Sequence, residues 1–208
     1  MKTWPLLLIL PLYAYINQNN DVQIWVEEYM DAKITSDLSI DIKNQWRFGN
    51  NASELYHIYL QGLLGYGLTD EAFIASGYRQ TWRRSSTAPW SLEYEPIAEC
   101  IFRRIHGWAG LDVRNRISYI IREVGENSWH WRGRVRWMMR EGPCRPYLSN
   151  ELFMNLQTGF DQDRIMFGVL IPFIEHVRGD LYYMLRFLNG AEYVTHQHIF
   201  GLGLDLQF

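Results

Sequence analysis

The last nine residues alternate strictly between apolar side chains and small or polar ones. Apolar residues stand at every even position from Phe200 to Phe208, including Leu204 and Leu206, and the positions between hold Gly201, Gly203, Asp205 and Gln207. A period of two is that of a β-strand with one apolar face. The pattern therefore predicts a terminal strand whose apolar side is formed by the even-numbered residues.

The same alternation recurs along the chain in segments of about 10–15 residues, separated by turn signals. That length is long for strands of soluble proteins and suits tilted membrane strands. Many such segments without a helical period predict an all-β protein, a sandwich or a barrel. The segments lie at 22–31, 36–48, 54–67, 71–83, 91–105, 108–122, 129–140, 147–156, 163–174, 180–188 and 196–208.

These eleven segments predict a single transmembrane, antiparallel, up-and-down β-barrel of 10–12 strands. An odd count is unusual, because bacterial single-chain barrels have an even number of strands. Either one short strand escapes the pattern, or the segment 22–31 is not an ordinary strand of the wall. The pattern alone leaves both alternatives open.

Bulk decides which face of each segment points inward. Apolar faces carrying Trp and Phe recur on successive segments and are hard to pack into one small lumen, so we expect them outside. The opposite faces carry Glu on 91–105 and Arg on the next two segments, where neighbouring strands can form ion pairs. We predict a lumen charge network of Glu93, Glu95, Glu99, Arg103, Arg114, Arg116, Arg132, Arg134 and Arg136.

The aromatic content is 15%, with 9 Trp and 13 Tyr, and is typical of a barrel with interfacial aromatic girdles. The candidate girdle residues stand near segment ends: Trp25, Trp46, Trp82, Trp90, Trp108 and Trp129. The formal net charge of -3 is too small to indicate a nucleic-acid partner.

The connections differ in character. Some are tight, at 68–70, 105–107 and 176–180, and others are polar and longer, at 49–53, 84–89, 125–128, 157–163 and 189–195. Short turns on one side and longer loops on the other are typical of outer-membrane barrels, with the short turns in the periplasm.

The first residues predict a secretory signal peptide. Lys2 precedes an apolar run at 4–12, and Ala14 is the expected cleavage point, which leaves 15–208 as the barrel domain. The run is too short to cross a bilayer as a helix, and no run of 18 or more apolar residues follows. Membrane insertion would therefore require a closed barrel.

Candidate chemistry is sparse, and we expect no catalytic residues, metal or cofactor. The stripe Arg114, Arg116, Arg132, Arg134 and Arg136 suits binding of phosphate or carboxylate solutes, but it equally suits a network that holds a narrow barrel shut. His196 and His198 share a face without a third metal ligand. Ser53, His57 and Glu54 are too common in rim loops to indicate a hydrolase. Cys100 and Cys144 are expected at different depths and unpaired.

Two resemblances favour the same compartment. An apolar final strand that ends on Phe208, with Leu206 and Leu204 before it, resembles the C-terminal assembly signal of bacterial outer-membrane barrels. The chain as a whole resembles a bacterial family of uncharacterised outer-membrane β-barrel proteins of unknown function. That resemblance implies a fold and a compartment but no catalytic residues. It lies in 21–25, 46–56, 77–79, 145–151, 159–164, 182–185 and 198–204.

Together these patterns predict an integral outer-membrane protein of a Gram-negative-type bacterium. The expected partners are outer-membrane lipids, the barrel-insertion machinery during assembly, and small solutes. The expected role is a narrow channel with a charged lumen. The alternatives are a closed structural or adhesive barrel acting through its exterior loops and, less favoured, a lipid hydrolase. The solute, the open or closed state of the lumen, the oligomeric state and the redox state of the two cysteines stay open.

Overall fold

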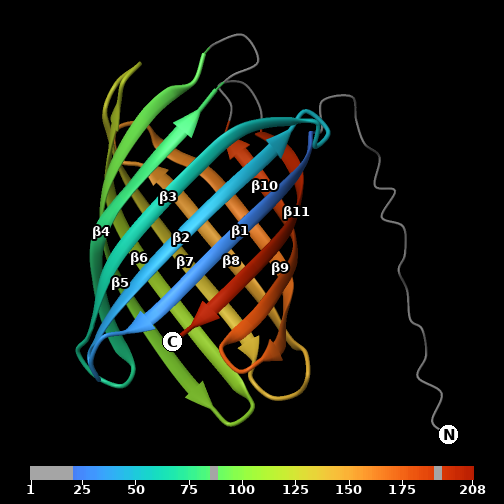
Figure 1. The fold of residues 1–208 in the computed structure, drawn as a ribbon. Helices are drawn as coiled ribbons and strands as arrows, with labels where there is room; N and C mark the ends of the chain where they lie inside the picture. Colours follow the sequence, from blue (N-terminus) through green and yellow to red (C-terminus); the bar gives the residue numbers. More distant parts are fainter. Residues whose placement is uncertain (1–20, 85–88, 190–193) are drawn as a thin grey trace, which may run out of the picture.

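The protein forms a closed β-barrel in the computed structural model, which describes residues 21–84, 89–189 and 194–208 (Figure 1). This confirms the all-β barrel expected from the alternation. The predicted signal peptide, 1–14, lies outside the described residues. Among the described residues, no helix is long and apolar enough to cross a membrane. The strands are β1 Val22–Lys33, β2 Leu38–Gly49, β3 Glu54–Gly67, β4 Ala72–Arg83, β5 Ser91–His106, β6 Ala109–Arg122, β7 Ser128–Met139, β8 Arg145–Asn155, β9 Gly159–Ile174, β10 Val177–Asn189 and β11 Val194–Gln207.

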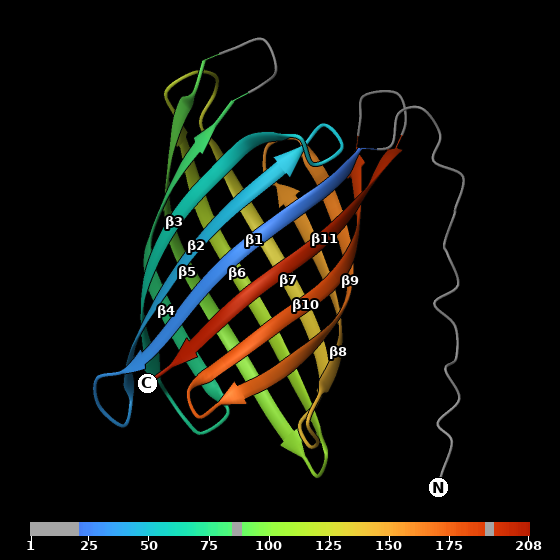
Figure 2. The same ribbon diagram turned by 45° about the vertical axis from the view of Figure 1, so that its right-hand side comes forward.

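Consecutive strands pair antiparallel around the wall, and β1 closes the barrel against β11 as a parallel pair (Figure 2). The parallel register runs from Val22↔His198 to Asp31↔Gln207. With eleven described strands in up-and-down order, the first and last must point the same way, so their pairing can only be parallel. The segment at 22–31 is therefore an ordinary wall strand, paired on one side with β11 and on the other with β2.

The first and last described residues lie at opposite ends of the barrel. The strand β11 finishes at the end that carries the turns 34–37, 68–71, 107–108, 140–144 and 175–176. Asp21 lies at the other end, where the turns 50–53, 123–127 and 156–158 connect strands. The loop expected at 157–163 is wrong in extent, because β9 begins at Gly159. The polar residues there alternate within a strand instead of forming a loop.

The outer wall is apolar and exposed. On β11, Phe200 and Leu202 are each 52% exposed, and Gly201 between them is buried and faces inward. Outward-facing apolar side chains continue around the wall as an uninterrupted series on neighbouring strands. Examples from seven further strands are Ile42, Leu60, Ile74, Phe102, Ile117, Trp137 and Phe167.

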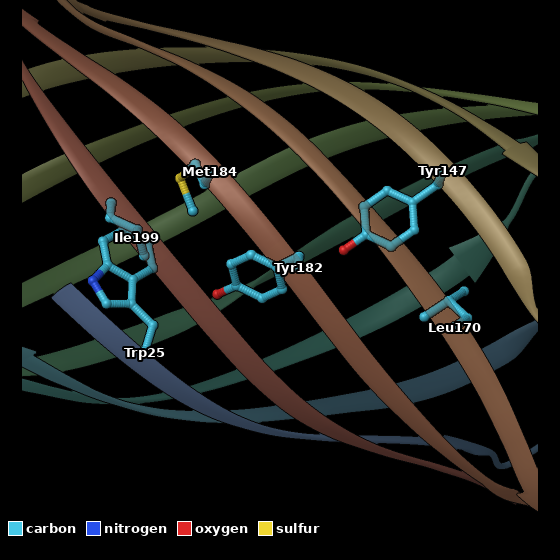
Figure 3. Packing of buried hydrophobic residues seen from close by; sticks show 6 residues of the cluster. All are labelled: Trp25, Tyr147, Leu170, Tyr182, Met184 and Ile199. Atoms are coloured by element: carbon cyan, nitrogen blue, oxygen red, sulfur yellow. The ribbon is translucent and has the colours of Figure 1, made fainter. Parts of the chain in front are cut away.

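Part of the inner wall is also apolar (Figure 3). The prediction that Trp25 belongs to an interfacial girdle is wrong, because its side chain is 1% exposed and points into the barrel. Trp25 is an odd-numbered residue of β1 and shares its face with Glu27 and Tyr29, which also line the lumen. Trp90, Trp108 and Trp129 are exposed. The inner cluster consists of Trp25, Tyr147, Leu170, Tyr182, Met184 and Ile199.

Two tyrosines of this cluster lie flat against the wall over glycines. A Cβ added to Gly201 would stand 1.9 Å from Cζ of Tyr182, and one added to Gly168 would stand 2.4 Å from Cζ of Tyr147. The missing side chains leave the space that each ring occupies. The rings are thereby directed along the wall, and their hydroxyl groups reach carboxylates two strands away.

Candidate functional site in the barrel lumen

The lumen contains two cavities that meet near the middle of the barrel. One, of about 580 Å³, lies toward the end that holds Phe208, and the other, of about 360 Å³, lies toward the opposite end. Both are strongly polar. Nine residues line the two cavities in common: Glu27, Lys43, Tyr59, Arg79, Arg116, Arg132, Arg134, Arg136 and Asp180.

Three carboxylates on the inner wall each bind cationic side chains from both flanking strands. On β6, Asp112 binds Arg103 of β5 at 3.1 Å and Arg134 of β7 at 2.6 Å. On β8, Glu151 binds Arg132 of β7 at 2.6 Å and Arg164 of β9 at 3.4 Å. The side chain of Glu93 on β5 likewise lies between Arg83 and Arg122. Cross-strand pairs of opposite charge of this kind stabilise a sheet and fix its register.

The deepest ion pair joins Arg116 to Glu99, with 2.7 Å between Nη2 and Oε2 and side-chain exposures of 3% and 2%. Arg116 also donates to the Oε1 atom of Gln61 at 3.1 Å, and Arg79 donates to the same oxygen at 2.6 Å. Arg79 in turn binds Glu95 at 2.9 Å. These contacts link four strands, β3 to β6, and fill part of the lumen where the two cavities meet.

The nine charged residues named from the sequence all line one cavity or the other. They do not behave alike. Seven of them form ion pairs, but Arg114 and Arg136 form none within 4 Å among the described residues. The guanidinium carbon of Arg136 instead lies 4.9 Å from the ring centroid of Tyr147. In the arginine stripe, carboxylates therefore neutralise Arg116, Arg132 and Arg134, whereas Arg114 and Arg136 have no ion-pair partner among the described residues.

Sequence reasoning missed a second set of lumen residues, which stand on β1, β2, β8 and β10. Glu27 of β1 binds Lys43 at 2.5 Å and accepts a hydrogen bond from the Tyr182 hydroxyl at 2.9 Å. The Tyr147 hydroxyl donates to Asp180 at 2.9 Å. The signal for these residues was present, because each shares the parity of the inward face on its strand.

The other sequence candidates do not assemble into sites. His196 and His198 have ring centroids 5.6 Å apart, and no group of three metal-ligating side chains occurs in the described part of the chain. His57 is buried on the inner wall, whereas the Ser53 hydroxyl donates to the Asn50 carbonyl oxygen. Cys100 and Cys144 are both free.

The terminal residues close the seam. The backbone N–H of Phe208 donates to the Asp31 carbonyl at 2.8 Å, and the N–H of Lys33 donates to the Phe208 carbonyl at 2.9 Å. The Phe208 ring stacks on His176, with the ring centroids 6.1 Å apart. Leu204 is exposed on the outer wall, and Leu206 is half-buried.

A family model described as "Protein of unknown function (DUF2490)" matches residues 22–197. The chain belongs to this family. The resemblance to a family of uncharacterised barrel proteins is thereby confirmed. The part of the chain that matches DUF2490 contains β1 to β10 and the first residues of β11, and so includes nearly all of the lumen charges. No curated protein matches the chain.

Proposed function

We propose that this DUF2490 protein is an outer-membrane β-barrel that acts as a narrow, anion-preferring passage. The lumen charge carries the proposal, and the apolar outer wall supports its location in a membrane. The proposed setting is the outer membrane of a Gram-negative-type bacterium, reached through the signal peptide expected at 1–14.

The outer wall supports membrane insertion because monomeric soluble proteins rarely expose apolar patches larger than a few hundred Å². Here exposed apolar side chains surround the barrel, while the predicted Glu and Arg stripes line the lumen. The strands have 11–16 residues, enough to cross a hydrocarbon core at a tilt. This is the inverse of a soluble barrel, whose apolar residues face inward.

The lumen supports anion preference because positive charge exceeds negative charge in both cavities. Among the described residues, the cavity toward Phe208 is lined by 13 Arg and Lys against 7 Asp and Glu, and the other by 11 against 6. Arg114 and Arg136, which have no ion-pair partner among the described residues, give part of this excess direct access to a solute. A net positive lining favours anions in a pore.

The test is conductance of the folded protein in planar bilayers under a salt gradient. We expect small single-channel steps and a reversal potential of anion-preferring sign. The double variant Arg114→Gln plus Arg136→Gln should shift the reversal potential toward zero, because it removes two unpaired cations from the lumen. Glu28→Gln, which changes an exposed charge on the outer side of β1, is the matched control and should leave the reversal potential unchanged.

A closed structural barrel is the second candidate, and one observation favours it. Arg79 and Arg116 converge on Gln61 and narrow the middle of the lumen. A flat current trace from protein that is folded, as judged by a gel-mobility shift on heating, would reject the passage and favour this closed barrel.

A further inference from the structure

We propose that the cavity at the end opposite Phe208 holds a binding site for a phosphate-type oxyanion, built from Arg47, Arg164 and Arg186. All three side chains line this cavity. The proposal rests on the proposed anion preference of the lumen and adds a defined site and a class of ligand. None of the three arginines belongs to the stripe on β6 and β7.

The three guanidinium groups come together around the closing seam. Arg47 stands on β2, and Arg164 and Arg186 are direct cross-strand partners on β9 and β10. Figure 2 shows these strands on either side of β1 and β11. The indole of Trp25 on β1 joins them, because its ring centroid lies 3.9 Å from the guanidinium carbon of Arg47 and 5.1 Å from that of Arg164.

The partners of two of these arginines are neutral. Arg47 donates through Nε to Oε1 of Gln45 at 2.5 Å. Arg186 donates through Nε to Gln162 at 2.5 Å and through Nη1 to Gln197 at 3.2 Å. Amide oxygens orient a guanidinium group without cancelling its charge. The side chains are therefore held in place while their positive charge stays available.

The third arginine is only weakly neutralised. Arg164 has one carboxylate partner, Glu151, at 3.4 Å, and Glu151 binds Arg132 more closely, at 2.6 Å. The Nε atom of Arg164 is buried without a hydrogen-bond partner in the described part of the chain. Its guanidinium carbon lies 4.1 Å from the Phe153 ring centroid, so an aromatic face again supplies the contact.

The three arginines give this part of the lumen an excess of positive charge that a bound anion would neutralise. Arg47 is 9% exposed and Arg164 is 6% exposed, and the three guanidinium groups repel one another. Buried charge without a counter-ion is costly. Glu93 and Glu95 are already paired with other arginines. Asp161 attracts Arg186, but it forms no ion pair within 4 Å among the described residues.

His57 adds a further polar group on the same wall. It is directly opposite Arg47 in the β2–β3 register, it is buried, and its Nε2 atom has no hydrogen-bond partner in the described part of the chain. The imidazole ring also lies in the electrostatic field of four positive side chains, those of Arg47, Arg83, Arg79 and Arg186. An imidazole N–H in this position can donate to a bound oxyanion.

The geometry favours a phosphate group over a carboxylate. Guanidinium groups bind oxyanions through planar forks, and each fork engages two oxygens. Three forks that approach from separate strands match a tetrahedral group with several charged oxygens. A monocarboxylate has two oxygens and satisfies about one fork. The ligand is therefore inorganic phosphate or the phosphate group of a small monoester.

Isothermal titration calorimetry on the full chain, folded in detergent, tests the site. The titrants are inorganic phosphate, glycerol 3-phosphate and acetate at matched ionic strength in chloride. We expect saturable phosphate binding and no measurable acetate binding. Equal affinity for the two phosphate compounds indicates recognition of the group alone, whereas tighter glycerol 3-phosphate binding indicates a monoester ligand, and both results support the site.

Variants locate the binding. Arg186→Gln and Arg47→Gln should each weaken phosphate binding by roughly tenfold or more, because each removes charge-assisted hydrogen bonds. The matched control is Arg84→Gln, an arginine toward the same end of the barrel that has a carboxylate partner, Glu54, at 3.2 Å. It should bind phosphate like the unmodified protein.

Absence of saturable phosphate binding would overturn the site, and so would unchanged affinity in both variants. If the variants fail to fold, the melting temperature of the unmodified protein tests whether phosphate binds. Phosphate must raise it relative to chloride at equal ionic strength, because a ligand that binds only the folded state stabilises that state. Conductance in chloride alone tests the passage, so a conducting barrel without phosphate binding rejects only the site. A non-conducting barrel that binds phosphate rejects only the passage.

Discussion

The ring of Tyr182 lies against the inner wall because residue 201 is a glycine. This arrangement lets a large aromatic residue line a narrow lumen while its hydroxyl reaches Glu27. Tyr147 over Gly168 repeats it and reaches Asp180. At the scale of single residues, the shape of the lumen therefore depends on where side chains are missing as much as on where charges stand.

Gly201→Ala should destabilise the folded barrel by about 1–3 kcal/mol, because the new Cβ would overlap the Tyr182 ring and force it away from the wall. Urea unfolding followed by tryptophan fluorescence measures the change. Gly62→Ala is the control, since an added Cβ there meets nothing within 4 Å. Equal unfolding midpoints for the two variants would show that the ring can move away without cost.

At the scale of strands, period-two alternation was sufficient to locate all of the described elements. Once the apolar side of 200–208 was assigned outward, the same rule turned the Glu and Arg stripes inward, as the lumen lining shows. The girdle prediction for Trp25 was wrong because it relied on the position of Trp25 near the start of a segment. The odd number of Trp25 places it on the inward face of β1, together with Glu27 and Tyr29. Alternation identifies the residues of a face but not their register or their neighbours across the lumen. For that reason the sequence alone could not predict that Arg79 and Arg116 converge on Gln61. Nor could it predict that Arg47, Arg164 and Arg186 lie together.

Two variants of the terminal residue separate its backbone from its ring. Deletion of Phe208 removes both of its hydrogen bonds to β1, so we expect a smaller folded fraction after refolding in detergent as well as in cells. Phe208→Ala keeps those bonds and should refold like the unmodified protein in detergent. In cells it should assemble less well if insertion machinery reads the aromatic side chain. The heat-dependent shift in gel mobility reports the folded fraction, and normal assembly of both variants in cells would make the terminal residue an ordinary one.

At the scale of the whole molecule, the parallel seam places Asp21 and Phe208 at opposite ends of the barrel. In the proposed membrane orientation, the end with Phe208 faces the periplasm and the turn at 156–158 faces the exterior. Each face of the membrane then meets one of the two lumen cavities. The proposed phosphate site belongs to the exterior cavity.

Cysteine labelling of intact cells tests this orientation. In a background of Cys100→Ser and Cys144→Ser, Thr158→Cys should react with a membrane-impermeant maleimide added outside. Ser36→Cys lies in the turn at the other end and should react only after the outer membrane is permeabilised. Both positions are exposed, so a difference in labelling reports their side of the membrane. The reverse pattern would invert the proposed orientation.

The odd strand count also limits how the chain can be rearranged. Proteins whose termini lie close together tolerate circular permutation through a short linker. Here β11 alone has 14 residues and runs over roughly 45 Å at about 3.3 Å per residue, and a linker from Phe208 back to Asp21 would have to travel the height of the barrel. Two copies fused head to tail meet the same obstacle. They could lie side by side in one orientation only if the linker ran the full height of the barrel, which in the proposed membrane setting means crossing the bilayer.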